Sequence, residues 1–124
     1  MSTYLGSERP AGGMELKLWL FMRSSGILLL GLSLGHFFTM HVFNSIHVID
    51  YDFVVRRYTG ILWRGYDLLL LWLAMLHGMN GLRILLDDYV PLKWRQLSIR
   101  LLYVSTIGLV VLGTWVIIFF KAGA

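Results

Sequence analysis

The stretch of sequence that decides the fold runs from residue 60 to residue 88, GILWRGYDLLLLWLAMLHGMNGLRILLDD. A helix rises about 1.5 Å per residue, so this stretch exceeds the roughly 20 residues that cross about 30 Å of hydrocarbon. Two comparable apolar segments flank it, at about residues 18–48 and 97–121. The sequence therefore predicts an all-α integral membrane protein with three transmembrane helices.

The composition supports a membrane protein. Of the 124 residues, 57% are hydrophobic and 15% are charged, and the mean hydropathy is +0.69, which leaves too little polar surface to cover a soluble domain. No cysteine is present, which excludes disulfides, thiol chemistry and iron–sulfur ligation by this chain. The pI of about 9.7 fits contacts with anionic membrane lipid, and no nucleic acid partner is expected.

The flanking charges predict the orientation. Residues 1–17 form a polar tail without the apolar core and cleavage site of a signal peptide, and residues 18–124 form a membrane anchor domain. More basic residues lie near the start of the first span and after the second span than on the opposite side of the membrane. Lys121 belongs to the smaller group on that opposite side. The larger group is Arg9, Lys17, Arg23, Lys93, Arg95 and Arg100. The positive-inside rule therefore predicts a multi-pass protein of the cell inner (cytoplasmic) membrane with a cytoplasmic N-terminus.

His77 lies inside the second span, eleven residues before Asp88 and roughly 16 Å from the membrane boundary. A ring nitrogen at this depth needs a partner. No close-spaced ligand pair for zinc surrounds it, whereas haem iron needs only one axial imidazole from a helix. Gly78 and Gly81 would let a flat macrocycle approach, and Arg23 could pair with a propionate. A hydrogen-bonded packing histidine is the alternative interpretation.

The first span carries two further histidines. Arg23 and His41 are five α-helical turns apart, so they are expected to share a face on which Ser24 lies nearby, while His36 points about 140° away from His41. His41 is expected near the outer side of the membrane. It therefore lies at a different depth from His77, and the two are not expected to bind the same ion.

Asp88 and Tyr89 mark the end of the second span. Pro91 follows them and cannot continue the helix, which places the pair at the cytoplasmic boundary. Taken alone, the dipeptide also fits an interfacial pair that ends a helix, with its tyrosine in the aromatic belt.

The interval between His77 and Asp88-Tyr89, followed by Val90 and Pro91, resembles the D-type hydrophobic membrane anchor of succinate dehydrogenase, respiratory complex II. The start of the first span, Phe21-Met22-Arg23-Ser24-Ser25-Gly26-Ile27-Leu28-Leu29, is similar to that family's entry motif. The resemblance covers nearly the whole chain.

The resemblance implies a function. His77 would be an axial ligand of a b-type haem, with the other ligand from the C-type partner anchor, in a helical bundle that the two anchors share. Arg23 would lie near the propionates, with Ser24 and Gly81 also in the cofactor site. Asp88 and Tyr89 would form part of the quinone site, next to the iron–sulfur subunit. Electrons would arrive from clusters on the iron–sulfur subunit of a complex that also contains a flavoprotein subunit, so this chain would not itself oxidise succinate.

Family members with two haems use a histidine of the first helix for the second haem, which favours His41, with His36 as the alternative. Two other interpretations stay open: a haem-free anchor of the same complex, and a small accessory or assembly subunit of an unrelated complex. The sequence does not choose between menaquinone and ubiquinone, between succinate oxidation and fumarate reduction, or between a single complex and a trimer of complexes.

Overall fold

The computed structural model describes residues 10–120. Within this range the chain forms the α-helices α1 (Gly13–Phe37), α2 (Tyr51–Thr59), α3 (Ile61–Tyr89) and α4 (Leu92–Phe119). A π-helical turn, η1 (Phe38–Val42), continues α1, and a 3-10 turn, η2 (Ile46–Val48), precedes α2. The described residues contain no strand, so the predicted all-α class is confirmed.

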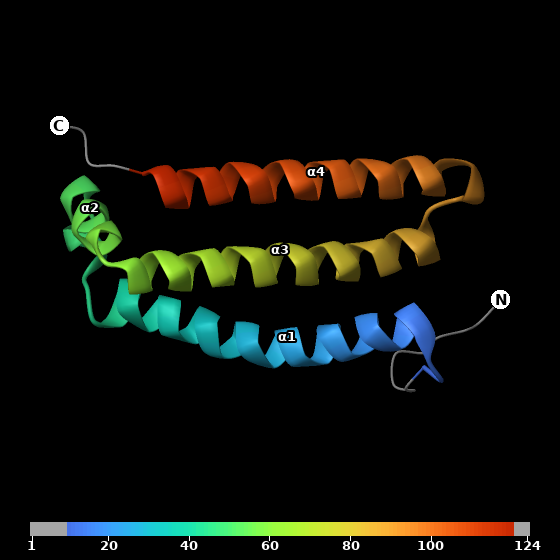
Figure 1. Ribbon diagram of the computed structural model, residues 1–124, viewed down its shortest axis with the longest axis horizontal. Coiled ribbons are helices and arrows are strands. Elements are labelled where there is room, and N and C mark those ends of the chain that lie inside the picture. Colours follow the sequence, from blue (N-terminus) through green and yellow to red (C-terminus); the bar gives the residue numbers. More distant parts are fainter. Residues whose placement is uncertain (1–9, 121–124) are drawn as a thin grey trace.

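The three long helices lie side by side, with α3 between α1 and α4 (Figure 1). The segments Gly13–Val42, Ile61–Tyr89 and Leu92–Phe119 are each long and apolar enough to cross a membrane. The prediction of three transmembrane helices is confirmed, and the chain is a multi-pass membrane protein. We call the end of the bundle where α3 finishes the Asp88 end, and the opposite end, which carries the short helix α2, the α2 end (Figure 1).

The helix boundaries differ from those expected from hydropathy alone. The first span begins at Gly13, inside the predicted tail of residues 1–17, and ends at Val42 rather than at residue 48. The second, expected at 60–88, occupies 61–89, and the third begins at Leu92 rather than at residue 97. Polar first turns extend α1 and α4, because Glu15 suits a helix N-terminus and Lys93 and Arg95 are good helix formers. Arg9 and Lys121, used to predict the orientation, lie outside the described residues.

The segment between the first two spans contains the helix α2. Asp50 caps its N-terminus, since the Asp50 side chain accepts a hydrogen bond from the backbone N–H of Phe53 at 2.8 Å. The helix then places Val54, Arg57 and Tyr58 beside α1 and α3. The connection is therefore a packed element and not a free loop.

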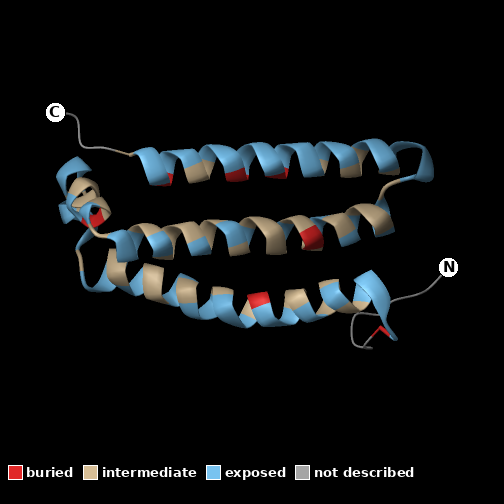
Figure 2. Cartoon of the chain, viewed as in Figure 1, coloured by how far each residue is buried: buried red, intermediate tan, exposed pale blue. Residues whose placement is uncertain are grey.

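Several of the buried side chains on the long helices are polar. Ser25 and Asn80 are 2% exposed and Thr106 is 5% exposed, whereas many large apolar side chains are exposed. In Figure 2 the few buried positions of the long helices lie among mostly exposed ones. This arrangement is typical of membrane bundles, where apolar side chains face lipid and small or polar ones join the helices. The Trp72 indole N–H donates to the Thr114 hydroxyl at 3.0 Å and so joins α3 to α4.

The π-helical turn η1 changes the direction of side chains at the end of α1. Its closing bond joins the Phe43 N–H to the Phe38 carbonyl at 2.9 Å, and the Asn44 side chain donates to the Thr39 carbonyl at 2.7 Å. A π turn takes more residues than an α turn. The arithmetic that placed His41 on the face of Arg23 assumed an uninterrupted α-helix, so it applies only as far as Phe37, and the shared face stays a prediction.

Candidate functional site

His77 lies near the middle of α3 and points toward α1. Its Nδ1 is 2.8 Å from the Ser25 hydroxyl oxygen, and a Cβ added at Gly26 would lie 3.5 Å from its Cε1. Twelve helical residues separate it from Tyr89, which is roughly 18 Å along the helix axis. His77 is thus a polar group deep in the bundle with one partner on the neighbouring helix, while its Nε2 makes no hydrogen bond within the described residues.

Only some of the residues that were expected near His77 lie close to it. Gly78 has open space beside it, since an added Cβ would meet nothing within 4 Å. Gly81 faces α1, where the Met22 methyl group would lie 3.7 Å from an added Cβ. Ser24 is exposed, and its hydroxyl donates to the Leu20 carbonyl at 2.8 Å. The serine that contacts His77 is therefore Ser25, one residue after the one singled out in the sequence.

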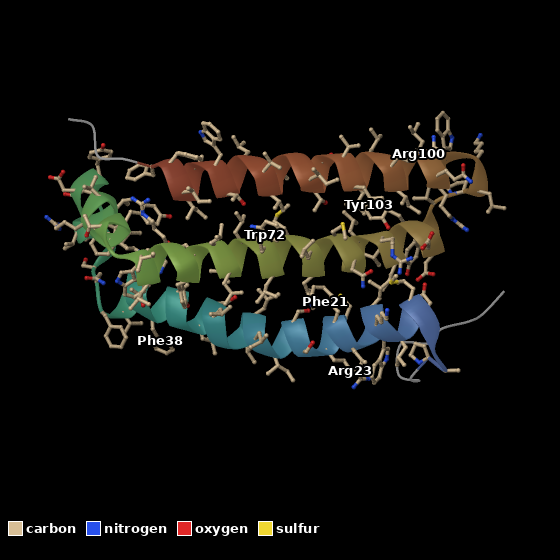
Figure 3. The ribbon with its side chains drawn as sticks, in the orientation of Figure 1. Phe21, Arg23, Phe38, Trp72, Arg100 and Tyr103 are labelled. Carbon is tan, nitrogen blue, oxygen red and sulfur yellow. The ribbon has the colours of Figure 1, made fainter. Side chains whose placement is uncertain are left out.

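Arg23 is not directed at His77. Its guanidinium carbon lies 4.2 Å from the centre of the Trp19 ring, and the side chain points away from α3 (Figure 3). Residues two apart on a helix differ by about 200°, so Arg23 and Ser25 lie on nearly opposite faces of α1. Within this chain, Arg23 belongs to an outward surface that stays open to another subunit or to lipid.

The two histidines of the first span have different surroundings. His41, in η1, is exposed and its ring stacks on Phe37 with 5.1 Å between ring centres. His36 lies closer to the other helices, with its Nδ1 3.8 Å from a carboxylate oxygen of Asp67 and without a hydrogen-bond partner among the described residues. The structure brings neither histidine to His77.

A buried charged cluster occupies the α2 end, and the sequence interpretation missed it. Arg57 donates to Oδ1 of Asp67 at 2.9 Å, with side chains 5% and 13% exposed, and Nδ1 of His36 lies 3.8 Å from the same oxygen. Burial and the nearby Asp67 carboxylate raise the pKa of the Tyr58 hydroxyl above its ordinary value. A cavity of about 350 Å³ adjoins these groups. The available signal was an aspartate inside a membrane span, which is costly unless it is paired.

Arg64 contributes a second polar contact at the α2 end. It donates to the backbone carbonyl of Tyr58 at 2.6 Å, of Ile118 at 2.9 Å and of Phe120 at 3.0 Å. The last two carbonyls lie at the C-terminus of α4, where the helix leaves acceptors without intrahelical partners. One side chain thus joins α2, α3 and the end of α4.

Asp88 and Tyr89 are both exposed at the end of α3, with Tyr89 81% exposed. Neither side chain makes a hydrogen bond to another described residue. A turn earlier, Arg83 contacts Asn80 at 3.3 Å, Asp87 at 3.5 Å and Glu15 of α1 at 3.9 Å. The Asp88 end therefore presents a free carboxylate and a free phenol beside charges that are already paired.

The described part of the chain holds no group of three or more metal-ligating side chains. A bare metal ion would need such a group, whereas a metal carried in a macrocycle would need a single imidazole from this chain. The arrangement thus defines a class of protein: a transmembrane helical protein with a histidine inside the bundle and charged groups toward the two ends of its spans.

The comparison with protein families agrees with this class. The model of the succinate dehydrogenase/fumarate reductase transmembrane subunit family matches residues 10–118. The chain belongs to this family, and it is therefore a membrane anchor of a dehydrogenase or reductase complex built from several subunits. A search of curated proteins finds no match.

Proposed function

We propose that this chain is the D-type anchor of a succinate:quinone oxidoreductase of the cytoplasmic membrane, with its N-terminus on the cytoplasmic side. It binds haem b together with the C-type partner anchor and forms part of the quinone site. Electrons reach it from the flavoprotein through the iron–sulfur subunit. Family membership supports the anchor role and favours it over an accessory subunit of an unrelated complex.

The observation that carries the proposal is the placement of His77. It lies between helices near the middle of a span, with one ring nitrogen in a hydrogen bond and the other without a partner among the described residues. The adjacent Gly78 leaves open space on the same helix. These features fit haem, because a porphyrin brings four nitrogens and needs one axial imidazole from this chain. A bound haem b would supply a one-electron carrier inside the membrane.

The quinone site belongs at the Asp88 end. A quinone that gains electrons develops negative charge on its carbonyl oxygens and then takes up protons. The exposed Tyr89 phenol can donate a hydrogen bond to such an oxygen, and the exposed Asp88 carboxylate can pass protons from water. Both groups are free to do so, because neither is hydrogen-bonded to another described residue.

The test is a reduced-minus-oxidised optical spectrum of the purified complex. We expect His77→Ala to lose the α-band of a b-type haem. His47→Ala is the matched control, because His47 is an exposed histidine in η2, and it should leave the spectrum unchanged. An unchanged spectrum in His77→Ala would contradict haem ligation and leave His77 as a hydrogen-bonding residue between α1 and α3.

The same spectra test a second haem. The family resemblance implies His41 as its ligand and His36 as the alternative. We expect a partial loss of the α-band in His41→Ala and not in His36→Ala, since the His36 ring already faces Asp67. The reverse result would move the second site to His36, and no loss in either variant would contradict a second haem ligated by this chain.

A further inference from the structure

Ser25 is almost completely buried at the contact between α1 and α3. It is 2% exposed, and its hydroxyl oxygen has three polar neighbours, of which the Met22 carbonyl is the farthest at 3.4 Å. The two close ones are the backbone carbonyl of Phe21 at 2.5 Å and Nδ1 of His77 at 2.8 Å. Both distances are within hydrogen-bonding range, so the single hydroxyl proton must lie toward one of the two.

The shorter contact decides where the proton lies. Two oxygens at 2.5 Å repel each other unless a hydrogen lies between them, and the Phe21 carbonyl carries none. The Ser25 hydroxyl therefore donates to Phe21. It can then only accept from His77, which must carry its own hydrogen on Nδ1. In a neutral imidazole this leaves the lone pair on Nε2.

We propose that Ser25 is a positioning residue that holds His77 as the Nδ1–H tautomer, with Nε2 ready to bind iron. The inference rests on the proposed haem site and adds to it a residue that determines which ring nitrogen is the ligand. Histidines that bind metals commonly donate their other N–H to a nearby acceptor, which orients the ring and makes the ligand nitrogen more basic. Here the acceptor is a hydroxyl that is itself polarised by donating to a carbonyl.

Local packing restricts the ring as well. The hydroxyl lies on α1 and the imidazole on α3, so the hydrogen bond joins two spans. Gly26 brings α1 close to the ring, with 3.5 Å between an added Cβ and His77 Cε1. Rotation of the ring would break a buried bond and leave the Nδ1 proton without an acceptor, which is costly in a membrane interior.

The chain supplies a matched control in the adjacent residue. The Ser24 hydroxyl also donates to a carbonyl four residues earlier, at 2.8 Å, but it is exposed and has no contact with His77. Ser24→Ala therefore removes the same kind of hydroxyl from the same helix. Ser25→Thr keeps the hydroxyl and reports whether the hydrogen bond, and not the exact side chain, is needed.

The experiment is a redox titration and a measurement of haem retention on the intact purified complex. We expect Ser25→Ala to keep the b-type α-band. It should retain haem about tenfold less tightly, as is usual when such a partner of a metal ligand is lost. It should also raise the midpoint potential, because a less basic imidazole stabilises ferric iron less. Ser24→Ala and Ser25→Thr should both match the wild-type protein.

Two results would overturn the inference, and they differ from each other. If Ser25→Ala matches the wild type in potential and haem retention while His77→Ala loses the haem, Ser25 has no positioning role and the haem site stands. If His77→Ala retains the haem, the proposed site itself is wrong and the inference fails with it.

Discussion

The two ends of the bundle carry similar side chains and use them in opposite ways. At the α2 end, the Arg57 and Asp67 side chains are 5% and 13% exposed and are paired with each other. At the Asp88 end, the Asp88 and Tyr89 side chains are exposed and make no hydrogen bond within the described residues. Polar groups are thus paired within the chain at the α2 end, whereas at the Asp88 end they remain available to bind a ligand.

This difference separates stability from binding. A buried charge tolerates the loss of its partner poorly, because nothing else compensates it there. An exposed carboxylate or phenol contributes little to folding and can meet a ligand at small cost. The α2 end is therefore expected to determine whether the chain folds, and the Asp88 end to determine what it binds.

The largest effect is expected at Arg57. Arg57→Ala leaves the Asp67 carboxylate buried without its partner, which costs about 3–5 kcal/mol for a pair of this kind. We expect a lower thermal midpoint and a lower yield of the detergent-solubilised complex. A double variant, Arg57→Leu with Asp67→Leu, should recover most of the loss because it removes both charges. Equal damage from the single and double variants would show that the pair is not the cause.

A smaller loss is expected at Arg64. Arg64→Ala removes hydrogen bonds from a charged donor to three backbone carbonyls, at about 1.5–3 kcal/mol for each such bond in buried surroundings and less where the carbonyl reaches water. Hydrogen exchange should show faster opening at the C-terminus of α4. Arg56→Ala is the control, since Arg56 is an exposed arginine on α2. Equal exchange in the two variants would mean that Arg64 does not stabilise α4.

At the Asp88 end we expect a loss of activity without a loss of stability. Tyr89→Phe should change the free energy of unfolding by less than about 0.5 kcal/mol, as is usual for exposed positions. Quinone reduction should fall about 100-fold, the usual effect of losing one positioned donor, while succinate oxidation with an artificial acceptor persists. Tyr103→Phe on α4 is the control. Undiminished quinone reduction in Tyr89→Phe would remove the phenol from the site.

The smallest effect concerns the charge state of Tyr58. Because burial and Asp67 raise its pKa, the folded chain keeps the phenol proton at a pH where the unfolded chain has lost it. The contribution of Tyr58 is therefore complete below the unfolded value of about 10 and declines as the pH rises above it. Ultraviolet difference titration should show one late phenolate transition that disappears in Tyr58→Phe. Its loss in Tyr89→Phe instead would contradict the assignment.

The long spans were predictable because a bilayer fixes their length and makes their composition apolar. The helix α2 was not, because nine residues with mixed charge give a weak hydropathy signal, and its stability depends on contacts with α1 and α3. Its cap residue, Asp50, was visible in the sequence. A capping aspartate before Phe53 and Val54 is the signal that would have indicated a short helix.

The candidate site was predictable where one residue marks a break in the pattern. His77 and Asp88-Tyr89 interrupt or end an apolar run, so they stand out. Asp67 precedes four leucines and interrupts the same span, but its importance depends on Arg57, which is ten residues away and on another helix. Composition could not show that Ser25, and not Ser24, contacts His77. Adjacent residues on a helix point about 100° apart, so the contact depends on how α1 is rotated against α3.

The π turn η1 leaves a trace that sequence comparison can detect. It holds one residue more than a continuous α-helix would need over the same length. Deleting one residue between 38 and 42 would let the segment close as an ordinary α-helix over the same length, so the residues after it would keep their direction. The chain would still bring α2 to the same side of the bundle, and Arg57 would still reach Asp67. Relatives with a one-residue gap at this place should therefore retain both members of the ion pair.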